Sequence, residues 1–146
     1  MTQPTTSLRL EVATPKASYR IEDDTVPIRV MLFNDGDEPV TVNARFAVSG
    51  EAGPGEVALE VHAPSGEVLP FAARVNIGQP MAEDFTVVSP HCFVGKQVDL
   101  LDYFHVDAAG TYELTAVYDN RWSGDGAPPA AWTGKLRSPA SAFEIV

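Results

Sequence analysis

The sequence predicts an all-β fold, a two-sheet antiparallel sandwich of about eight or nine short strands with almost no helix. Apolar and polar residues alternate in short runs, which is the period of half-buried strands. No stretch carries the three-and-four spacing of an amphipathic helix. Twelve prolines and eleven glycines separate the runs. With 146 residues and no internal repeat, we expect a single domain over residues 1–146.

Four runs in the first half of the chain have this alternating pattern. We expect strands at residues 8–12, 26–33, 40–46 and 57–61. Residues 34–39 turn the chain between the second and third strands and contain Asp-Gly, a dipeptide typical of β-hairpins. The pattern therefore predicts a hairpin at this turn.

The second half is less regular. A strand is expected at residues 68–77, where Pro70 suits an edge strand or a bulge. Clearer strands are expected at residues 85–88, 94–100 and 111–118, followed by a terminal strand segment over residues 132–136 and 142–146.

Residues 105–120, HVDAAGTYELTAVYDN, are the most informative stretch. Tyr112, Leu114 and Tyr118 lie on one face of the expected strand. The lead-in from Asp107 through Gly110 to Tyr112 has an Asp-x-x-Gly-x-Tyr pattern. This pattern is similar to the tyrosine corner of immunoglobulin-type sandwiches.

Three phrases carry a wider resemblance, namely RVMLFNDGDEPVTVNARF, VDLLDYFHVDAAGTYELTAVYDN and the closing WTGKL with FEIV. Over most of the chain they resemble immunoglobulin-like domains of uncharacterised bacterial proteins. They are distantly similar to the β-sandwich that precedes the catalytic domain of deuterolysin-type metalloproteases, and to small intracellular proteinase inhibitors of bacteria. The resemblance implies an immunoglobulin-like fold. Because no H-E-x-x-H zinc motif is present, it implies no protease activity.

The charge balance bears on partners and on location. Twenty acidic and ten basic side chains give a formal charge of −10 and a pI near 4.5. Such a field repels nucleic acid and anionic membranes, so we expect neither as a partner. The single cysteine allows no internal disulfide, and the first residues lack the pattern of a signal peptide. We therefore expect a cytoplasmic protein.

No residue pattern points to catalysis or to a cofactor. Cys92 and His91 are adjacent, and neighbours in an extended chain point to opposite faces, so His91 is poorly placed as a base. We expect Cys92 to be structural or incidental, since free cysteines usually behave as small buried hydrophobes. His62 and His105 have no zinc-ligand spacing. We expect a protein without enzymatic activity.

Two acidic clusters, residues 22–24 and 35–38, flank the second expected strand. About ten residues at about 3.3 Å each separate them by roughly 30 Å, so they cannot share one ion. Either loop has the oxygen ligands that calcium prefers. The commoner role of Asp in such loops is to cap the local backbone, which is our expectation here.

The loop at residues 119–131, DNRWSGDGAPPAA, carries the sharpest functional signal. It exceeds the usual hairpin length, and Trp122 lies among Gly, Pro and charged residues. An exposed Trp beside Arg121 is a typical anchor for a partner. Alternatively, Trp122 folds back over the open end of the sandwich. Trp132, at the head of the last strands, is expected in the core.

We therefore expect a protein-interaction module whose contact surface lies at one end of the sandwich. The residues predicted to form this surface are Asp35, Asp37, Arg121, Trp122 and Asp125. The first alternative is a proteinase inhibitor that uses residues 50–55 or 119–131 as its exposed loop. The second is a carbohydrate-binding module, which requires two or three coplanar surface aromatics.

Overall fold

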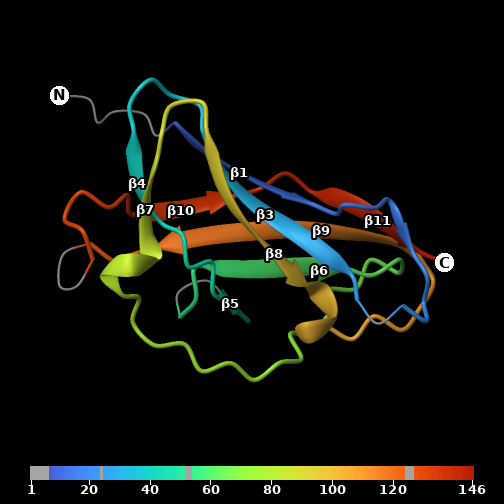
Figure 1. The fold of residues 1–146 in the computed structure, drawn as a ribbon. Coiled ribbons are helices and arrows are strands. Elements are labelled where there is room, and N and C mark those ends of the chain that lie inside the picture. The colour runs from blue at the N-terminus through green and yellow to red at the C-terminus, as the bar shows by residue number, and fades with distance from the viewer. Residues whose placement is uncertain (1–6, 24, 52–53, 124–126) are drawn as a thin grey trace.

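The computed structural model describes residues 7–23, 25–51, 54–123 and 127–146, and these residues form an all-β fold (Figure 1). The helical elements among them are two 3-10 turns, η1 (Ala82–Asp84) and η2 (Leu100–Asp102). The expectation of almost no helix is confirmed. The strands are β1 (Leu8–Ala13), β2 (Ser18–Tyr19), β3 (Pro27–Asn34), β4 (Val40–Asn43), β5 (Val48–Ser49), β6 (Val57–His62), β7 (Phe85–Val88), β8 (Phe93–Asp99), β9 (Gly110–Asn120), β10 (Gly134–Arg137) and β11 (Ser141–Ile145).

Sheet A consists of three antiparallel strands in the order β1-β3-β8. Leu10 lies opposite Leu32, and Leu32 lies opposite Val94, so the apolar phases of the three strands coincide. The even-numbered residues of β1 and β3 are buried, and the odd-numbered residues face outward. This alternation places one side of the sheet in the core and leaves the other accessible.

Sheet B is mixed, so the expectation of purely antiparallel sheets is wrong. Its order is β2-β11-β9-β6-β5, and β10 pairs with the second half of β9. The end strands are the parallel ones, because β2 runs parallel to β11 and β5 parallel to β6. Each of them has only two residues, and the alternating pattern of so short a segment contains no information on its direction. A third, two-stranded sheet pairs β4 with β7.

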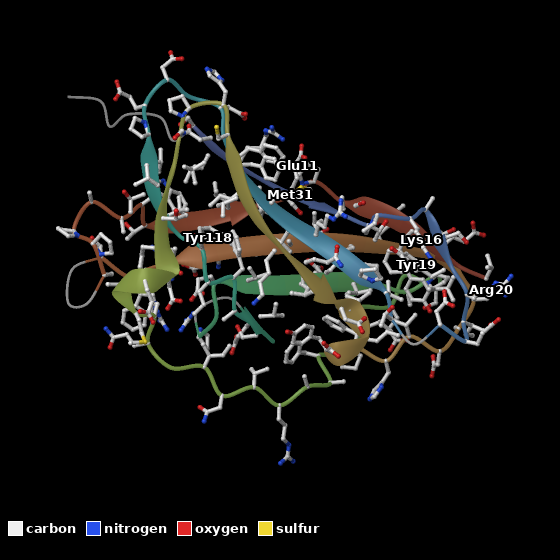
Figure 2. All side chains as sticks on the ribbon, in the orientation of Figure 1. Glu11, Lys16, Tyr19, Arg20, Met31 and Tyr118 are labelled. Carbon is white, nitrogen blue, oxygen red and sulfur yellow. The ribbon has the colours of Figure 1, made fainter. Side chains whose placement is uncertain are left out.

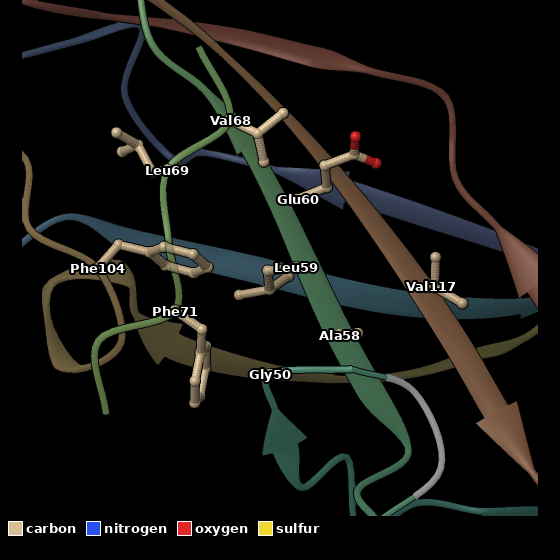
Figure 3. Close-up of a pocket in the computed structure, with 9 residues that line it drawn as sticks. All are labelled: Gly50, Ala58, Leu59, Glu60, Val68, Leu69, Phe71, Phe104 and Val117. Carbon is tan, nitrogen blue, oxygen red and sulfur yellow. The ribbon is translucent and has the colours of Figure 1, made fainter. Parts of the chain in front are cut away.

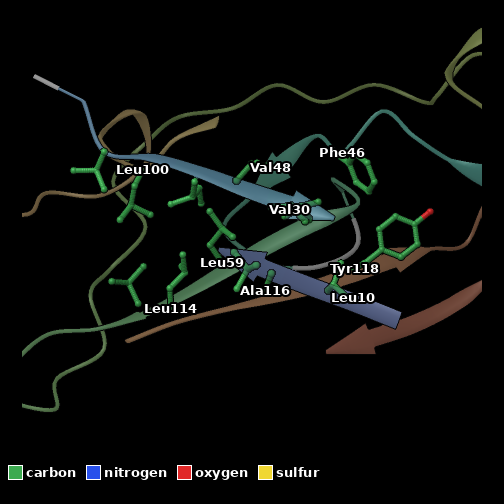
Figure 4. Packing of buried hydrophobic residues seen from close by; sticks show 14 of the residues in the cluster. Leu10, Val30, Phe46, Val48, Leu59, Leu100, Leu114, Ala116 and Tyr118 are labelled. Carbon is green, nitrogen blue, oxygen red and sulfur yellow. The ribbon is translucent and has the colours of Figure 1, made fainter. Parts of the chain in front are cut away.

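The inner faces of sheets A and B share one cluster of buried side chains (Figure 4). Leu10 and Val30 come from sheet A, and Leu59, Leu114 and Ala116 come from sheet B. Burial of each large aliphatic side chain contributes about 1.5–3 kcal/mol to the free energy of folding. This shared core holds the two sheets together.

The corner at the start of β9 closes as the sequence predicts. The Tyr112 hydroxyl donates a hydrogen bond of 2.6 Å to the backbone oxygen of Ala108. Gly110 has a φ of +136°, and a Cβ there would lie 2.5 Å from Pro64 Cγ, so only glycine fits. The Tyr112 ring stacks on Phe143 at 5.4 Å between ring centroids. The strand is therefore anchored at its first turn.

The Asp-Gly turn does not close a hairpin. Strand β3 pairs with β1 and β8, so neither of its edges is free for β4, which pairs with β7 instead. Asn34, which is fully buried, fixes this change of sheet. Its side-chain nitrogen donates to the backbone oxygens of Glu38 at 2.7 Å and Val88 at 3.0 Å.

Two further strand predictions are wrong in their boundaries, and eleven strands form among the described residues instead of eight or nine. Residues 68–77 are irregular apart from one bridge between Val68 and His62. Pro70 cannot donate a backbone hydrogen bond, so the pairing ends there. The Ala72 amide then donates a hydrogen bond to the backbone oxygen of Tyr103. The run at 40–46 ends at Asn43. Phe46, with a φ of 49°, lies in the break before β5.

Candidate functional site

Asn120, at the end of β9, anchors the loop that carries Trp122. Its side chain is buried, and its Oδ1 accepts hydrogen bonds from the Trp122 amide at 3.2 Å and from Asn43 Nδ2 at 3.3 Å. Its Nδ2 donates to the backbone oxygens of Trp122 at 3.2 Å and Trp132 at 2.7 Å. One buried amide thus fixes both ends of the loop. The sequence pattern does not single out Asn120, because this residue lies where the alternation of β9 ends.

Trp122 itself is half-buried, intermediate between the two alternatives that the sequence left open. The Arg121 guanidinium lies over its ring at 5.7 Å from the centroid. Ser123 Oγ donates to the backbone oxygen of Pro129 at 3.0 Å, which ties the two sides of the loop together. Asp125 lies outside the described residues.

Trp132 packs against the core, as predicted. Its ring stacks on Tyr118 at 6.0 Å between centroids, and its amide donates to the backbone oxygen of Thr41 at 2.8 Å. The Tyr118 hydroxyl donates to the backbone oxygen of Asn43 at 2.9 Å, and burial raises the pKa of this phenol. The far side of the loop is therefore attached to β4.

The turn that contains Asp35 and Asp37, at the top of Figure 1, precedes β4, whereas Asn120, which holds Trp122, bonds Asn43 at the end of β4. At about 3.3 Å per residue, the four residues of β4 span roughly 13 Å. Asp35 is paired with Arg9 at 2.7 Å, and this hydrogen bond holds the pKa of Asp35 below its ordinary value. Asp37 lies 3.6 Å from His91. Among the described residues, no ion pair or hydrogen bond joins this turn to the Trp122 loop.

A second accessible region, on the outer side of sheet A, was not predicted from the sequence. We call it the sheet A face, and define it by six outward-facing residues of β3 and β8: Arg29, Met31, Phe33, Phe93, Gly95 and Gln97. Phe93 is 59% exposed and packs on Phe33 at 5.1 Å between ring centroids. Arg9 lies over the Phe33 ring at 4.3 Å. Figure 2 labels Met31 beside Glu11, its partner in β1.

A hollow of about 340 Å³ lies on the sheet A face, lined by Arg29, Met31, Phe93, Gly95, Lys96 and Gln97. Gly95 forms its floor, since a Cβ there would lie 2.8 Å from the Val30 oxygen and 3.1 Å from Met31 Cγ. A glycine inside a strand is a signal for close approach of another group, and this signal was present in the sequence.

A second hollow, of about 250 Å³, lies beside β6 (Figure 3). Its walls are mostly apolar and include Leu69, Phe71 and Phe104. Among the described residues that line this hollow, Glu60 is the ionisable one. Its carboxylate already accepts hydrogen bonds from Arg137 at 2.7 Å and from His62 at 3.0 Å. The described lining of the hollow therefore offers no unpaired ionisable side chain to a ligand.

The remaining candidate residues do not assemble into a reactive group. Cys92 is exposed, so it is not a core residue, and His91 beside it is also exposed with a φ of 62°. His62 pairs with Glu60, and His105 is exposed. Within the described part of the chain, no three His, Cys, Asp or Glu side chains gather as metal ligands. Nor does that part contain a helix with the length and apolar character to cross a membrane.

Comparison with protein-family models and with curated protein sequences finds no match for this chain.

Proposed function

We propose that this protein is a non-enzymatic protein-interaction module with an immunoglobulin-like sandwich fold. The tyrosine corner at Tyr112 and the core shared by the inner faces of sheets A and B support the fold assignment. The exposed Cys92 thiol, with no disulfide, fits a reducing compartment such as the cytoplasm. The partner is another protein.

The observation that carries the proposal is the fixed presentation of Trp122. Asn120 bonds both the amide and the carbonyl of Trp122, so the residue does not have to be ordered when a partner arrives. A preorganised aromatic side chain with an arginine over its ring is a typical centre of a protein interface. The half-exposed Trp122 and Arg121 form that centre, and Asp37 belongs to a more distant acidic rim.

Affinity capture tests this role of the loop. Immobilised wild type, Trp122→Ala and Phe93→Ala would be incubated with lysate of the native organism, and the retained proteins identified by mass spectrometry. We expect one partner that the wild type and Phe93→Ala retain and Trp122→Ala loses. We also expect Trp122→Ala to change Tm by less than about 4 °C, because the side chain is only half-buried.

Two results would overturn this assignment. If the same proteins are retained by all three forms, the Trp122 loop is not the contact surface. If Trp122→Ala lowers Tm by about 10 °C or more, the indole belongs to the core and its loss cannot report on binding.

A further inference from the structure

We infer that the free edge of β8, together with the sheet A face, binds an extended segment of another protein that carries an acidic side chain two residues from an apolar one. This surface is separate from the Trp122 loop. The inference rests on the proposed protein-binding role of the molecule, but not on that loop.

The backbone of β8 is available for strand addition. Hydrogen bonds from Asn34 N to the Cys92 oxygen and from Leu100 N to the Val26 oxygen lie at the two ends of the β3–β8 ladder. Since bonded pairs alternate in an antiparallel ladder, the even-numbered residues of β8 bond β3. The amides and carbonyls of the odd-numbered residues therefore point away from β3. They are Phe93, Gly95, Gln97 and Asp99, and β8 is the last strand of its sheet.

Three of these odd-numbered residues, Phe93, Gly95 and Gln97, lie on the sheet A face. A strand added to β8 therefore places its own side chains over this face, about 4.5–5.5 Å from those directly opposite. The residue opposite Gly95 lies above the 340 Å³ hollow, between Phe93 and Met31. This position favours an apolar side chain such as leucine.

Charge complementarity specifies the second feature of the segment. Arg29 lies opposite Gln97 in the ladder, so it adjoins the position two residues from the apolar one. Arg29 lines the hollow and forms no ion pair with a carboxylate of the described residues. Its Nε donates to Gln97 Oε1 at 3.2 Å. Lys96 lies opposite the buried Val30, so its side chain points to the other side of the sheet, where its Nζ donates to the Arg45 oxygen at 3.5 Å. In a chain with a net charge of −10, the accessible and unpaired Arg29 favours an acidic side chain of the partner.

A second copy of this chain fits the edge poorly. Symmetric pairing about Lys96, the middle residue of β8, would place two lysine side chains opposite each other. Each copy also has a net charge of −10. A lysine whose side chain points inward from an edge strand commonly prevents such pairing between two copies.

A peptide titration tests the inference. The probe is acetyl-Thr-Glu-Thr-Leu-Thr-Glu-Thr-amide, which presents Glu, Leu and Glu on one face in either strand direction. Its matched control has Lys in place of both Glu. We expect the Glu peptide to bind the wild type at least about tenfold more tightly than the Lys peptide at 50 mM salt, and less tightly as salt is raised.

Charge-reversal variants locate the site. Arg29→Glu should weaken binding of the Glu peptide at least about tenfold. Arg74→Glu is the control, because Arg74 is exposed on the irregular segment between β6 and β7 and should leave binding unchanged. Trp122→Ala should also leave it unchanged, so failure of the Trp122 proposal and failure of this inference give different results.

The inference is overturned if the wild type binds both peptides equally, or if Arg29→Glu binds the Glu peptide as the wild type does. It is also overturned if sedimentation shows a wild-type dimer that Phe93→Ala abolishes, since a second copy would then occupy the sheet A face.

Discussion

The two sheets have outer faces of different character, although both alternate buried and accessible residues. On the outer side of sheet B, Glu60 is paired with Arg137 and His62. On the sheet A face, Phe93 is exposed, and the neighbouring Arg29 has no carboxylate partner among the described residues. A charge that is already paired gains little from a partner. Accessible apolar area beside an unpaired cation gains from an acidic partner.

The ion pair between Arg45 and Glu56 is more buried than the charges on either outer face. Its loss is therefore expected to lower the free energy of unfolding most. Glu56 is 1% exposed and accepts two hydrogen bonds from Arg45, at 2.8 and 2.6 Å. We expect Glu56→Gln to lower the free energy of unfolding by about 3–5 kcal/mol, because the guanidinium is left without its counter-charge. Urea denaturation at pH 7 measures this. A loss below about 1 kcal/mol would contradict the assignment of a buried pair.

Gly95→Val is expected to have the next largest effect and tests the floor of the sheet A hollow. The added Cβ meets the Val30 oxygen at 2.8 Å, so we expect a loss of about 1–3 kcal/mol from overpacking. The matched change on the outer side of sheet B is Ala58→Val, which adds two methyl groups beside the 250 Å³ hollow. It should change the free energy of unfolding by less than about 0.5 kcal/mol. Equal losses would show that the two hollows do not differ in their packing.

Removal of the paired charge on sheet B should have a small, pH-dependent effect. Hydrogen bonds from Arg137 and then His62 lower the pKa of Glu60 below its usual 4.5. The ionised carboxylate therefore stabilises the fold above pH 4.5, and this contribution is lost as the pH falls through the lowered pKa. Because Glu60 is partly exposed, we expect Glu60→Gln to cost only about 0.2–1 kcal/mol at pH 7.

Thermal melts at pH 7 and pH 3 measure the Glu60 effect. The wild type should lose more stability on acidification than Glu60→Gln does. Glu113→Gln serves as the control, because Glu113 is exposed on the same side of sheet B and forms no ion pair among the described residues. If Glu60→Gln and the wild type respond identically to acid, the paired state of the sheet B face is not supported.

The smallest effect on stability is expected for Phe93→Ser, on the sheet A face. Phe93 is 59% exposed, so its removal should change the free energy of unfolding by less than about 1 kcal/mol. Binding of the Glu peptide should nevertheless weaken, since the apolar wall of the hollow is lost. A large loss of stability with unchanged peptide binding would reverse the roles that we assign to this residue.

What the sequence predicts well in this protein is local. The corner at Tyr112 depends on six consecutive residues, and the alternation of β1, β3, β6 and β9 is visible within each run. Pairing is not local. The Asp-Gly turn has the composition of a hairpin, yet the buried Asn34 connects it to Val88, 54 residues away, and directs β4 to β7.

The candidate sites show the same limit. Trp122 is conspicuous in the sequence, but the amide that fixes it, Asn120, is a single polar residue at the end of a strand. The sheet A face depends on the register that brings Phe93 opposite Phe33 and Gly95 opposite Met31, and this register cannot be obtained from either strand alone. Gly95 within a strand was the visible signal, although it did not indicate which strand would lie beside it.

An NMR titration of the ¹⁵N-labelled protein with the Glu peptide tests the difference between the two faces most directly. We predict that the amide signals of Phe93, Gly95 and Gln97 shift, because these amides point to the free edge of β8. The amides of β10 on sheet B should remain unchanged. Shifts confined to β10 or to residues 121–123, or no shifts in β8, would contradict the account.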